Sequence, residues 1–115
     1  MKNINTYINE SSNRDWEKKY KKFKKLISKE DMKLFSEIAN DKKNNNINTS
    51  EDIEQMFWKG ELKDKVDEIW KKIDTYLNQA GSSSDEVCDR YSLARGGKQY
   101  KIEVAAQMIY FLNTR

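Results

Sequence analysis

The clearest pattern in the chain is a row of aromatic and aliphatic residues in its first third. These residues recur at positions i, i+4, i+7 and i+11 and are Trp16, Tyr20, Phe23 and Ile27. That spacing forms one stripe of a helix. Asn13 is a suitable N-cap residue just before the stripe, whereas residues 1–12 are expected to fray at a free terminus. The pattern predicts a helix over about residues 13–27.

Two capping signals predict further helices. Ser28 is followed by Asp31, and Thr49 by Asp52, each at the three-residue spacing of a capping box. Apolar residues repeat at helical spacing behind each signal: Met32, Phe35 and Ile38 or Ala39 after the first, and Ile53, Met56 and Phe57 after the second. We therefore expect one helix that ends near residue 40 and another that begins near residue 49.

A long apolar stripe follows in the middle of the chain. Its members are Trp58, Leu62, Val66, Ile69, Ile73 and Leu77, with Trp70 beside them. Gly60 interrupts the stripe, and because glycine inside a helix costs roughly 1 kcal/mol, we expect a bend or break there. Gly81 is well placed to end the helix, since glycine readily adopts the left-handed conformation found just beyond helix C-termini.

The last third of the chain fits two readings. Ser84 is expected to start a capped helix, and Gly96–Gly97 to force a turn. Beyond that turn the alternation of Tyr100, Ile102 and Val104 fits a short β-hairpin near residues 91–104. A second pattern is helical and comprises Ile102, Ala105, Ala106, Ile109 and Leu112. We favour a helix over residues 101–113, because the segment 105–108 consists of good helix formers.

These elements predict an all-α fold, a small bundle of about five helices. Its length of 115 residues suits a single helical domain spanning residues 1–115. Residues 40–48 and 81–84 are expected to form loops, and the long middle helix and the tail helix to form the centre. The hairpin near residues 91–104 remains the alternative for that segment.

Composition excludes several classes of function. The chain has no histidine and one cysteine, Cys88, so Ser-His and Cys-His catalysis, a histidine-ligated metal and an internal disulfide are all excluded. We predict no enzyme, no cofactor and no metal. No apolar run is long enough to span a membrane, and we expect no signal peptide. A single free thiol is typical of a reducing compartment, which predicts a cytoplasmic protein.

Structural roles fit the acidic residues Asp85, Glu86 and Asp89 and the single cysteine better than catalytic roles do. Asp85 and Glu86 follow Ser84 and suit the first turn of a helix, where the dipole favours anions. Asp89 lies one turn after Asp85, but no calcium-loop spacing accompanies the pair. Cys88 shares helical spacing with Tyr91 and lacks a histidine base, so we interpret it as a small core residue.

Charge is mild overall, at +3, but unevenly distributed. Segment 14–33 holds nine cations and four anions, whereas segment 34–80 holds seven cations and ten anions, so their net charges are +5 and −3. The candidate binding residues of the basic segment are Lys18, Lys21, Lys22, Lys25 and Lys29. A merely solvated helix face is the simplest interpretation; docking to an acidic protein and non-specific binding to nucleic acid are the functional ones.

Three further residues are candidates for partner binding. Arg95 and Lys98 flank the Gly96–Gly97 pair, whose backbone N–H groups are well suited to an anion, although the sequence of a phosphate-binding loop is absent. Trp58 lies beside the expected break at Gly60 and is the better candidate for an exposed tryptophan anchor.

The opening segment, MKNINTYINESS, resembles those of small proteins of phages and mobile elements, and so does the composition of the chain, which is rich in asparagine and lysine. The resemblance covers about a tenth of the chain and includes no functional motif. It implies an inhibitor of a host or competing system, such as an anti-defence protein.

Together these features predict a small non-catalytic binding protein: an adaptor, inhibitor or regulator of a larger macromolecular partner. We expect a protein partner, which includes a component of a nucleic-acid-handling complex. The alternative is a sequence-nonspecific nucleic-acid-binding protein that uses the lysine-rich helix.

Overall fold

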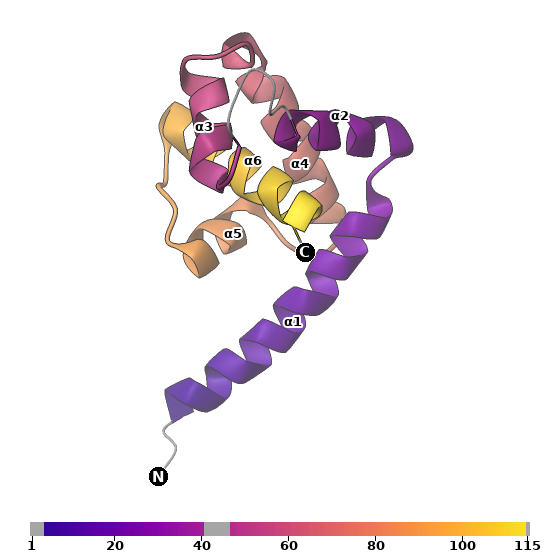
Figure 1. The fold of residues 1–115 in the computed structure, drawn as a ribbon. Coiled ribbons are helices and arrows are strands. Elements are labelled where there is room, and N and C mark those ends of the chain that lie inside the picture. The colour runs from indigo at the N-terminus through magenta and orange to yellow at the C-terminus, as the bar shows by residue number, and fades with distance from the viewer. Residues whose placement is uncertain (1–3, 41–46, 115) are drawn as a thin grey trace.

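The computed structural model describes the backbone of residues 4–40 and 47–114, and the side chains of residues 14–40 and 47–114. Within these ranges the chain forms six α-helices and one 3₁₀ turn, and no strand (Figure 1). The helices are α1 (Ile4–Leu26), α2 (Lys29–Ala39), α3 (Ser50–Trp58), α4 (Val66–Gln79), α5 (Ser84–Tyr91) and α6 (Gly97–Thr114), and the 3₁₀ turn η1 (Lys63–Lys65) precedes α4.

The all-α prediction is confirmed for this part of the chain, with one helix more than expected. The hairpin near residues 91–104 is not formed: this segment holds the end of α5, a loop and the first turns of α6. The backbone of α1 is already helical at Ile4, so the expectation of a cap at Asn13 was wrong. Residues 1–3 and most of the expected 40–48 loop, residues 41–46, lie outside the described residues.

Local capping signals fixed the starts of α2 and α3 where the sequence placed them and the start of α5 one residue earlier, whereas α6 begins at Gly97 instead of near residue 101. The Ser28 side chain accepts a hydrogen bond from the backbone N–H of Asp31 at 3.1 Å, and the Asp52 carboxylate accepts one from the backbone N–H of Thr49 at 2.9 Å. The cap of α5 is Ser83 rather than Ser84: the Ser83 hydroxyl accepts the backbone N–H of Glu86 at 3.1 Å.

The long middle stripe is broken where glycine predicted a break. Helix α3 ends at Trp58 and α4 begins at Val66, with Gly60 and η1 between them. At the other end of α4, Gly81 adopts φ +86°, and the backbone N–H of Ser82 donates to the carbonyl of Leu77 at 2.9 Å. This is the closing bond of a Schellman C-cap, which satisfies carbonyls that the helix leaves unpaired.

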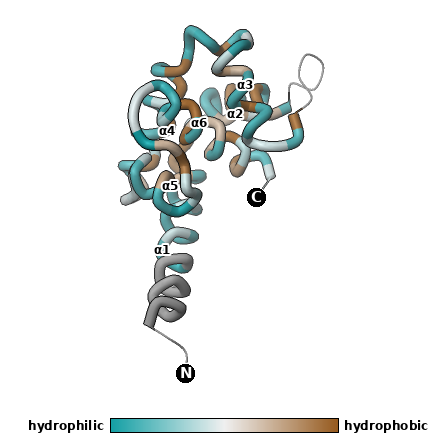
Figure 2. The backbone as a smooth tube through the Cα atoms, turned by 90° about the vertical axis from the view of Figure 1, so that its left-hand side faces the viewer, coloured by the Kyte–Doolittle hydropathy of each residue, from teal (hydrophilic) through white to brown (hydrophobic). Residues whose placement is uncertain are grey.

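Helix α6 lies at the centre of the fold, packed against α2, α3 and α4 (Figure 1). It is buried on most of its sides, and its fully buried residues are Ile102, Val104, Ala105, Ala106, Met108 and Ile109. Figure 2 shows hydrophobic positions gathered where these helices meet. Leu77, Ile73 and Ile69 of α4 complete the core from one side. The tail helix is central as expected, whereas the expected long middle helix is divided into α3, η1 and α4.

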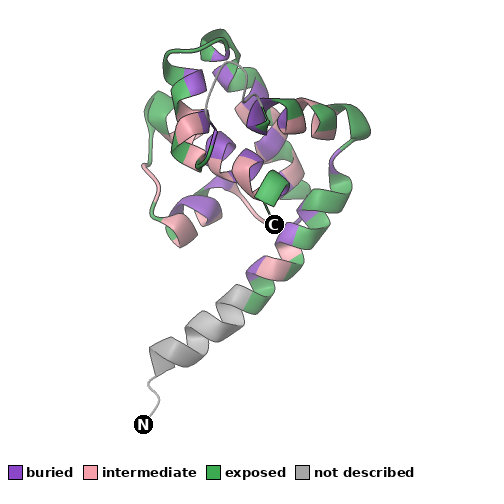
Figure 3. Ribbon diagram, viewed as in Figure 1, coloured by how far each residue is buried: buried purple, intermediate pink, exposed green. Residues whose placement is uncertain are grey.

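The described side chains of α1, which begin at Arg14, are buried along one side of the helix (Figure 3). Its predicted stripe is buried in full: Trp16, Tyr20, Phe23 and Ile27 are at most 8% exposed. The Tyr20 ring meets Phe111 of α6 edge-on, with centroids 6.3 Å apart, and the Trp16 ring meets Tyr91 of α5 at 6.1 Å. Edge-to-face ring pairs of this kind add stability beyond the buried area, so the aromatic residues fix the orientation of α1.

Candidate functional site

The outward side of α1 repeats the spacing of its buried side. Within α1 the buried stripe occupies positions 16, 20 and 23, and lysines occupy positions 18, 22 and 25. A shift of two residues turns a helix by roughly 200°, so the lysine row lies nearly opposite the rings. Fixing the rings in the core therefore points these lysines at solvent.

All the predicted lysines on this side are exposed in the structure. They are Lys18, Lys21, Lys22 and Lys25 of α1 and Lys29 at the start of α2, and Arg14 is exposed at the amino-terminal end of the described stretch. None of these lysines is within ion-pairing distance of a carboxylate of the described residues. We call these five lysines the lysine face; the part from Lys18 to Lys25 is roughly 10 Å long at 1.5 Å per residue.

Lys19 shows what a structural lysine of the same helix looks like. Its ammonium group lies 3.0 Å from the Asp15 carboxylate and 3.1 Å from the Glu86 carboxylate of α5. Hydrogen bonds to Asp15 and Glu86 raise the pKa of Lys19 above its ordinary value. Lys19 thus ties α1 to α5, whereas the lysine face has no such partner among the described residues.

The other predicted candidates lie on a different part of the molecule. Trp58, at the end of α3, is 37% exposed, and the Lys98 ammonium lies 5.7 Å from its ring centroid. The structure thereby brings together two residues that lie 40 positions apart in the sequence. Cation–π contacts at exposed sites contribute about 0.5–1 kcal/mol, so this pair helps to hold the start of α6 against the end of α3.

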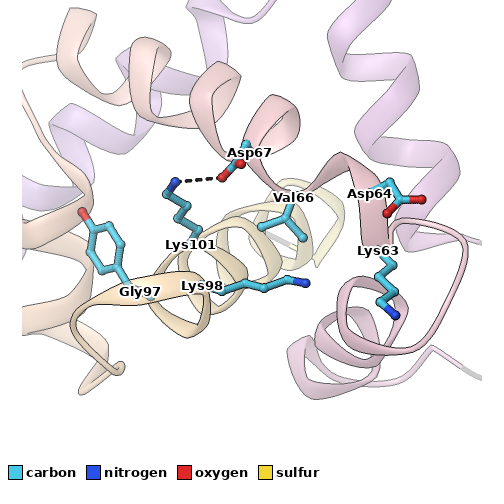
Figure 4. A pocket seen from close by; sticks show the side chains of 8 residues that line it. Lys63, Asp64, Val66, Asp67, Gly97, Lys98 and Lys101 are labelled. Atoms are coloured by element: carbon cyan, nitrogen blue, oxygen red, sulfur yellow. Dashed lines mark hydrogen bonds and ion pairs between the residues drawn. The ribbon is translucent and has the colours of Figure 1, made fainter.

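A hollow of about 690 Å³ adjoins this pair (Figure 4). Its charged lining residues are three lysines and two aspartates: Lys63, Lys98, Lys101, Asp64 and Asp67. Val66, Gly97 and Tyr100 complete the lining. The Lys101 ammonium and the Asp67 carboxylate are 2.7 Å apart, and this pairing lowers the pKa of Asp67. Charges of both signs compensate each other here, so the hollow is a weaker electrostatic site than the lysine face.

Arg95 does not join Lys98 in an anion-binding loop. Its guanidinium forms an ion pair with the Asp89 carboxylate at the end of α5. Gly96 and Gly97 adopt φ +95° and +64°, as the expected turn requires. The loop is also fastened by Glu103, whose carboxylate accepts the backbone N–H of Ala94 at 3.2 Å.

The acidic residues and the cysteine near α5 have structural partners. Glu86 accepts from Lys19 and from the Ser82 hydroxyl, and Asp89 pairs with Arg95. Cys88 is buried, and burial raises the pKa of its thiol, which keeps the sulfur protonated and unreactive. The described residues hold no cluster of three or more cysteine or carboxylate side chains that could bind a metal ion.

Sequence reasoning missed two features near the candidate residues. Leu26 is 38% exposed beside the lysine face; because it is the last residue of α1, its direction was not evident from periodicity. Ser84 is buried, accepts the indole N–H of Trp70 at 3.2 Å and donates to Asp74 at 2.7 Å. Such a long-range polar link has no local sequence signal.

None of the described helices is both long and apolar enough to pass through a lipid bilayer. Comparison with known proteins found no matching family model, no significantly similar curated protein and no significantly similar solved structure.

Proposed function

We propose that the protein is a non-catalytic binding protein that docks through the lysine face of α1 to an acidic surface of a larger protein. The observation that supports this most is the contrast on a single helix, α1: rings fixed in the core on one side, and four exposed lysines without carboxylate partners among the described residues on the other. Uncompensated charge of one sign steers an oppositely charged partner and fixes its orientation.

An acidic protein fits this face better than nucleic acid. The five candidate positions are lysines, and lysine lacks the bidentate geometry with which arginine reads bases. The rings of α1 that would stack on bases are buried: Trp16 is 2% exposed and Phe23 is fully buried. The alternative that remains is backbone tracking of phosphates, which is sequence-nonspecific and strongly salt-dependent.

Within this function the protein acts in the cytoplasm as an adaptor, inhibitor or regulator. The single thiol, Cys88, is buried and free, which suits a reducing compartment. An inhibitor encoded by a phage or mobile element is a special case, supported by the resemblance of the opening segment to such proteins.

Affinity purification with mass spectrometry tests the proposal with three baits. The baits are the unchanged protein, the variant Lys18→Glu/Lys22→Glu/Lys25→Glu, and the matched variant Lys59→Glu/Lys63→Glu/Lys98→Glu, which makes the same change of net charge at the other end of the molecule. We expect one acidic protein to be retained by the first bait and reduced at least tenfold on the second; retention on the third bait would show that Lys98, the other candidate in that variant, is not needed for binding. Equal retention on all three would contradict the proposal.

Binding to nucleic acid is measured separately, with duplex DNA and single-stranded RNA of random sequence. The proposal predicts no binding of either at about 50 mM salt. Binding that falls steeply as salt rises, and that is lost in the Lys18→Glu/Lys22→Glu/Lys25→Glu variant, would establish the alternative function instead.

A further inference from the structure

A leucine is exposed among the lysines where α1 turns into α2. Helix α1 ends at Leu26 and α2 begins at Lys29, and this corner lies at the edge of the molecule (Figure 1). Leu26 and Trp58 are the two large hydrophobic residues exposed in the described part of the chain. The Trp58 ring has the Lys98 ammonium over it, so Leu26 is the more open of the two to a partner.

Exposed lysines lie on both sides of Leu26. Lys22 precedes it by four positions, so the two side chains are neighbours one helical turn apart. Lys25 directly precedes Leu26, and Lys29 follows at the start of α2; both are exposed. Glu30 is an exposed carboxylate at this corner, and the three lysines outnumber it. Leu26 is thus an apolar side chain with a mainly cationic border.

The corner is fastened on its inner side. Ile27 is buried, and the backbone N–H of Ser28 donates to the Tyr76 hydroxyl of α4 at 3.3 Å. That hydroxyl in turn donates to the Asp31 carboxylate at 2.5 Å. These contacts hold the chain directly after Leu26, so its place among the lysines is set before a partner arrives. A group fixed in this way loses less conformational entropy on binding.

We propose that Leu26 is the apolar anchor of the lysine face, and that it contacts a patch of apolar side chains bordered by carboxylates on the acidic partner. This inference rests on the proposed function and adds the apolar part of the partner's chemistry. The lysines attract and orient an acidic surface, but exposed ion pairs contribute little by themselves. An apolar centre within a polar rim is the common arrangement of specific interfaces, and Leu26 is placed to supply that centre.

Two synthetic acidic peptides of equal length and net charge test the inference by fluorescence anisotropy with the full chain. One is an amphipathic helix of glutamate and leucine, and the other has glutamine at every leucine position. We expect the glutamate–leucine peptide to bind the unchanged protein at least tenfold more tightly. Because salt screens ion pairs and leaves apolar contacts in place, this ratio should persist as salt rises from about 50 to 300 mM.

Substitutions of Leu26 locate the preference. Leu26→Gln keeps the net charge and should make the two peptides bind equally, whereas Leu26→Met keeps an apolar side chain of similar size and should retain the preference. Trp58→Gln is the matched control at the other exposed hydrophobic residue and should also retain it. Circular dichroism confirms that the variants are folded. A preference that persists in Leu26→Gln, or that is lost equally in Trp58→Gln, would overturn the inference.

The same peptides separate this inference from the function on which it rests. Equal binding of both peptides to the unchanged protein, lost for both in Lys18→Glu/Lys22→Glu/Lys25→Glu, would overturn the role of Leu26 and leave the function of the lysine face in place. Absence of binding by either peptide, or binding that the triple variant leaves unchanged, would contradict both.

Discussion

Helices α1 and α6 use apolar residues in opposite ways. Helix α6 is buried on most of its sides at the centre of the fold, whereas the described part of α1 is buried along a single stripe (Figure 3). A helix surrounded by the core has little surface left for a partner. A helix attached by one stripe retains a free side, and on α1 that side holds the lysine face. From this difference we propose that α6 and the inner side of α1 contribute stability, and that the outer side of α1 binds the partner.

The largest expected effect is a difference in stability between two substitutions at adjacent positions, one on each side of α1. Phe23 is fully buried, so Phe23→Ala should lower the free energy of unfolding by about 3–5 kcal/mol. Lys22 is exposed, and Lys22→Ala should change it by less than about 0.5 kcal/mol. Urea denaturation of the two variants measures both values. Similar losses for Phe23→Ala and Lys22→Ala would show that α1 has no division into two sides.

The second test compares α6 with the outer side of α1. Ala106 is fully buried between packed helices, so Ala106→Leu should overfill the core and cost about 1–3 kcal/mol. Lys21→Leu adds an apolar side chain on the exposed side of α1 and should be nearly neutral for unfolding. Thermal unfolding followed by circular dichroism distinguishes the two; a stable Ala106→Leu variant would indicate free space around α6.

A third test concerns the polar link that joins α2 to α4. Asp31 accepts the Tyr76 hydroxyl at 2.5 Å and pairs with Lys72 at 3.2 Å. These partners, the tyrosine hydroxyl foremost, lower the pKa of Asp31 in the folded state. The contribution of Asp31 to stability is therefore present above the unfolded pKa, near 3.9, and is lost as pH falls through the lower folded pKa.

Asp31→Asn isolates this contribution. Asparagine keeps an oxygen that can accept from Tyr76 but loses the charge. Because a hydrogen bond to a charged group contributes about 1.5–3 kcal/mol and a neutral one about 0.5–1.5 kcal/mol, the variant should be less stable by about 1–2 kcal/mol at pH 7. The difference between Asp31→Asn and the unchanged protein should shrink as the pH of urea denaturation is lowered from about 5 to 2. A difference that is constant over this range would show that ionised Asp31 gains nothing from the folded state.

The smallest expected effect compares two neighbouring lysines. The Lys19 side chain is 24% exposed and paired with Asp15 and Glu86, whereas Lys18 is exposed. Partly exposed ion pairs contribute about 0.2–1 kcal/mol, so Lys19→Gln should destabilise by that amount and Lys18→Gln should not. Denaturation at low and high salt measures the difference, which should diminish as salt screens the pairs.

Sequence alone predicted the features whose cause is local. The stripe from Trp16 to Ile27 is buried because its spacing matches the helix, and Ser28 and Gly81 cap helices through bonds to residues three to five positions away. The side of α1 that holds the lysine face follows from the same periodicity. These predictions needed no knowledge of which helices meet.

Features that depend on distant segments were not predictable in this way. Alternation at Tyr100, Ile102 and Val104 fits a strand and also fits a helix buried on nearly all sides, and only the surrounding helices decide between them. The Lys98–Trp58 contact and the Arg95–Asp89 pair each require the final placement of α6 or its preceding loop. The candidate site was therefore predicted on α1 and was less well predicted at the start of α6.

The most direct test of the division of α1 into two sides is urea denaturation of the Lys18→Glu/Lys22→Glu/Lys25→Glu variant, with retention of the acidic partner measured on the same preparation. The division predicts a free energy of unfolding within about 0.5 kcal/mol of the unchanged protein and a loss of retention of at least tenfold. A loss of more than about 2 kcal/mol, or full retention at unchanged stability, would contradict it.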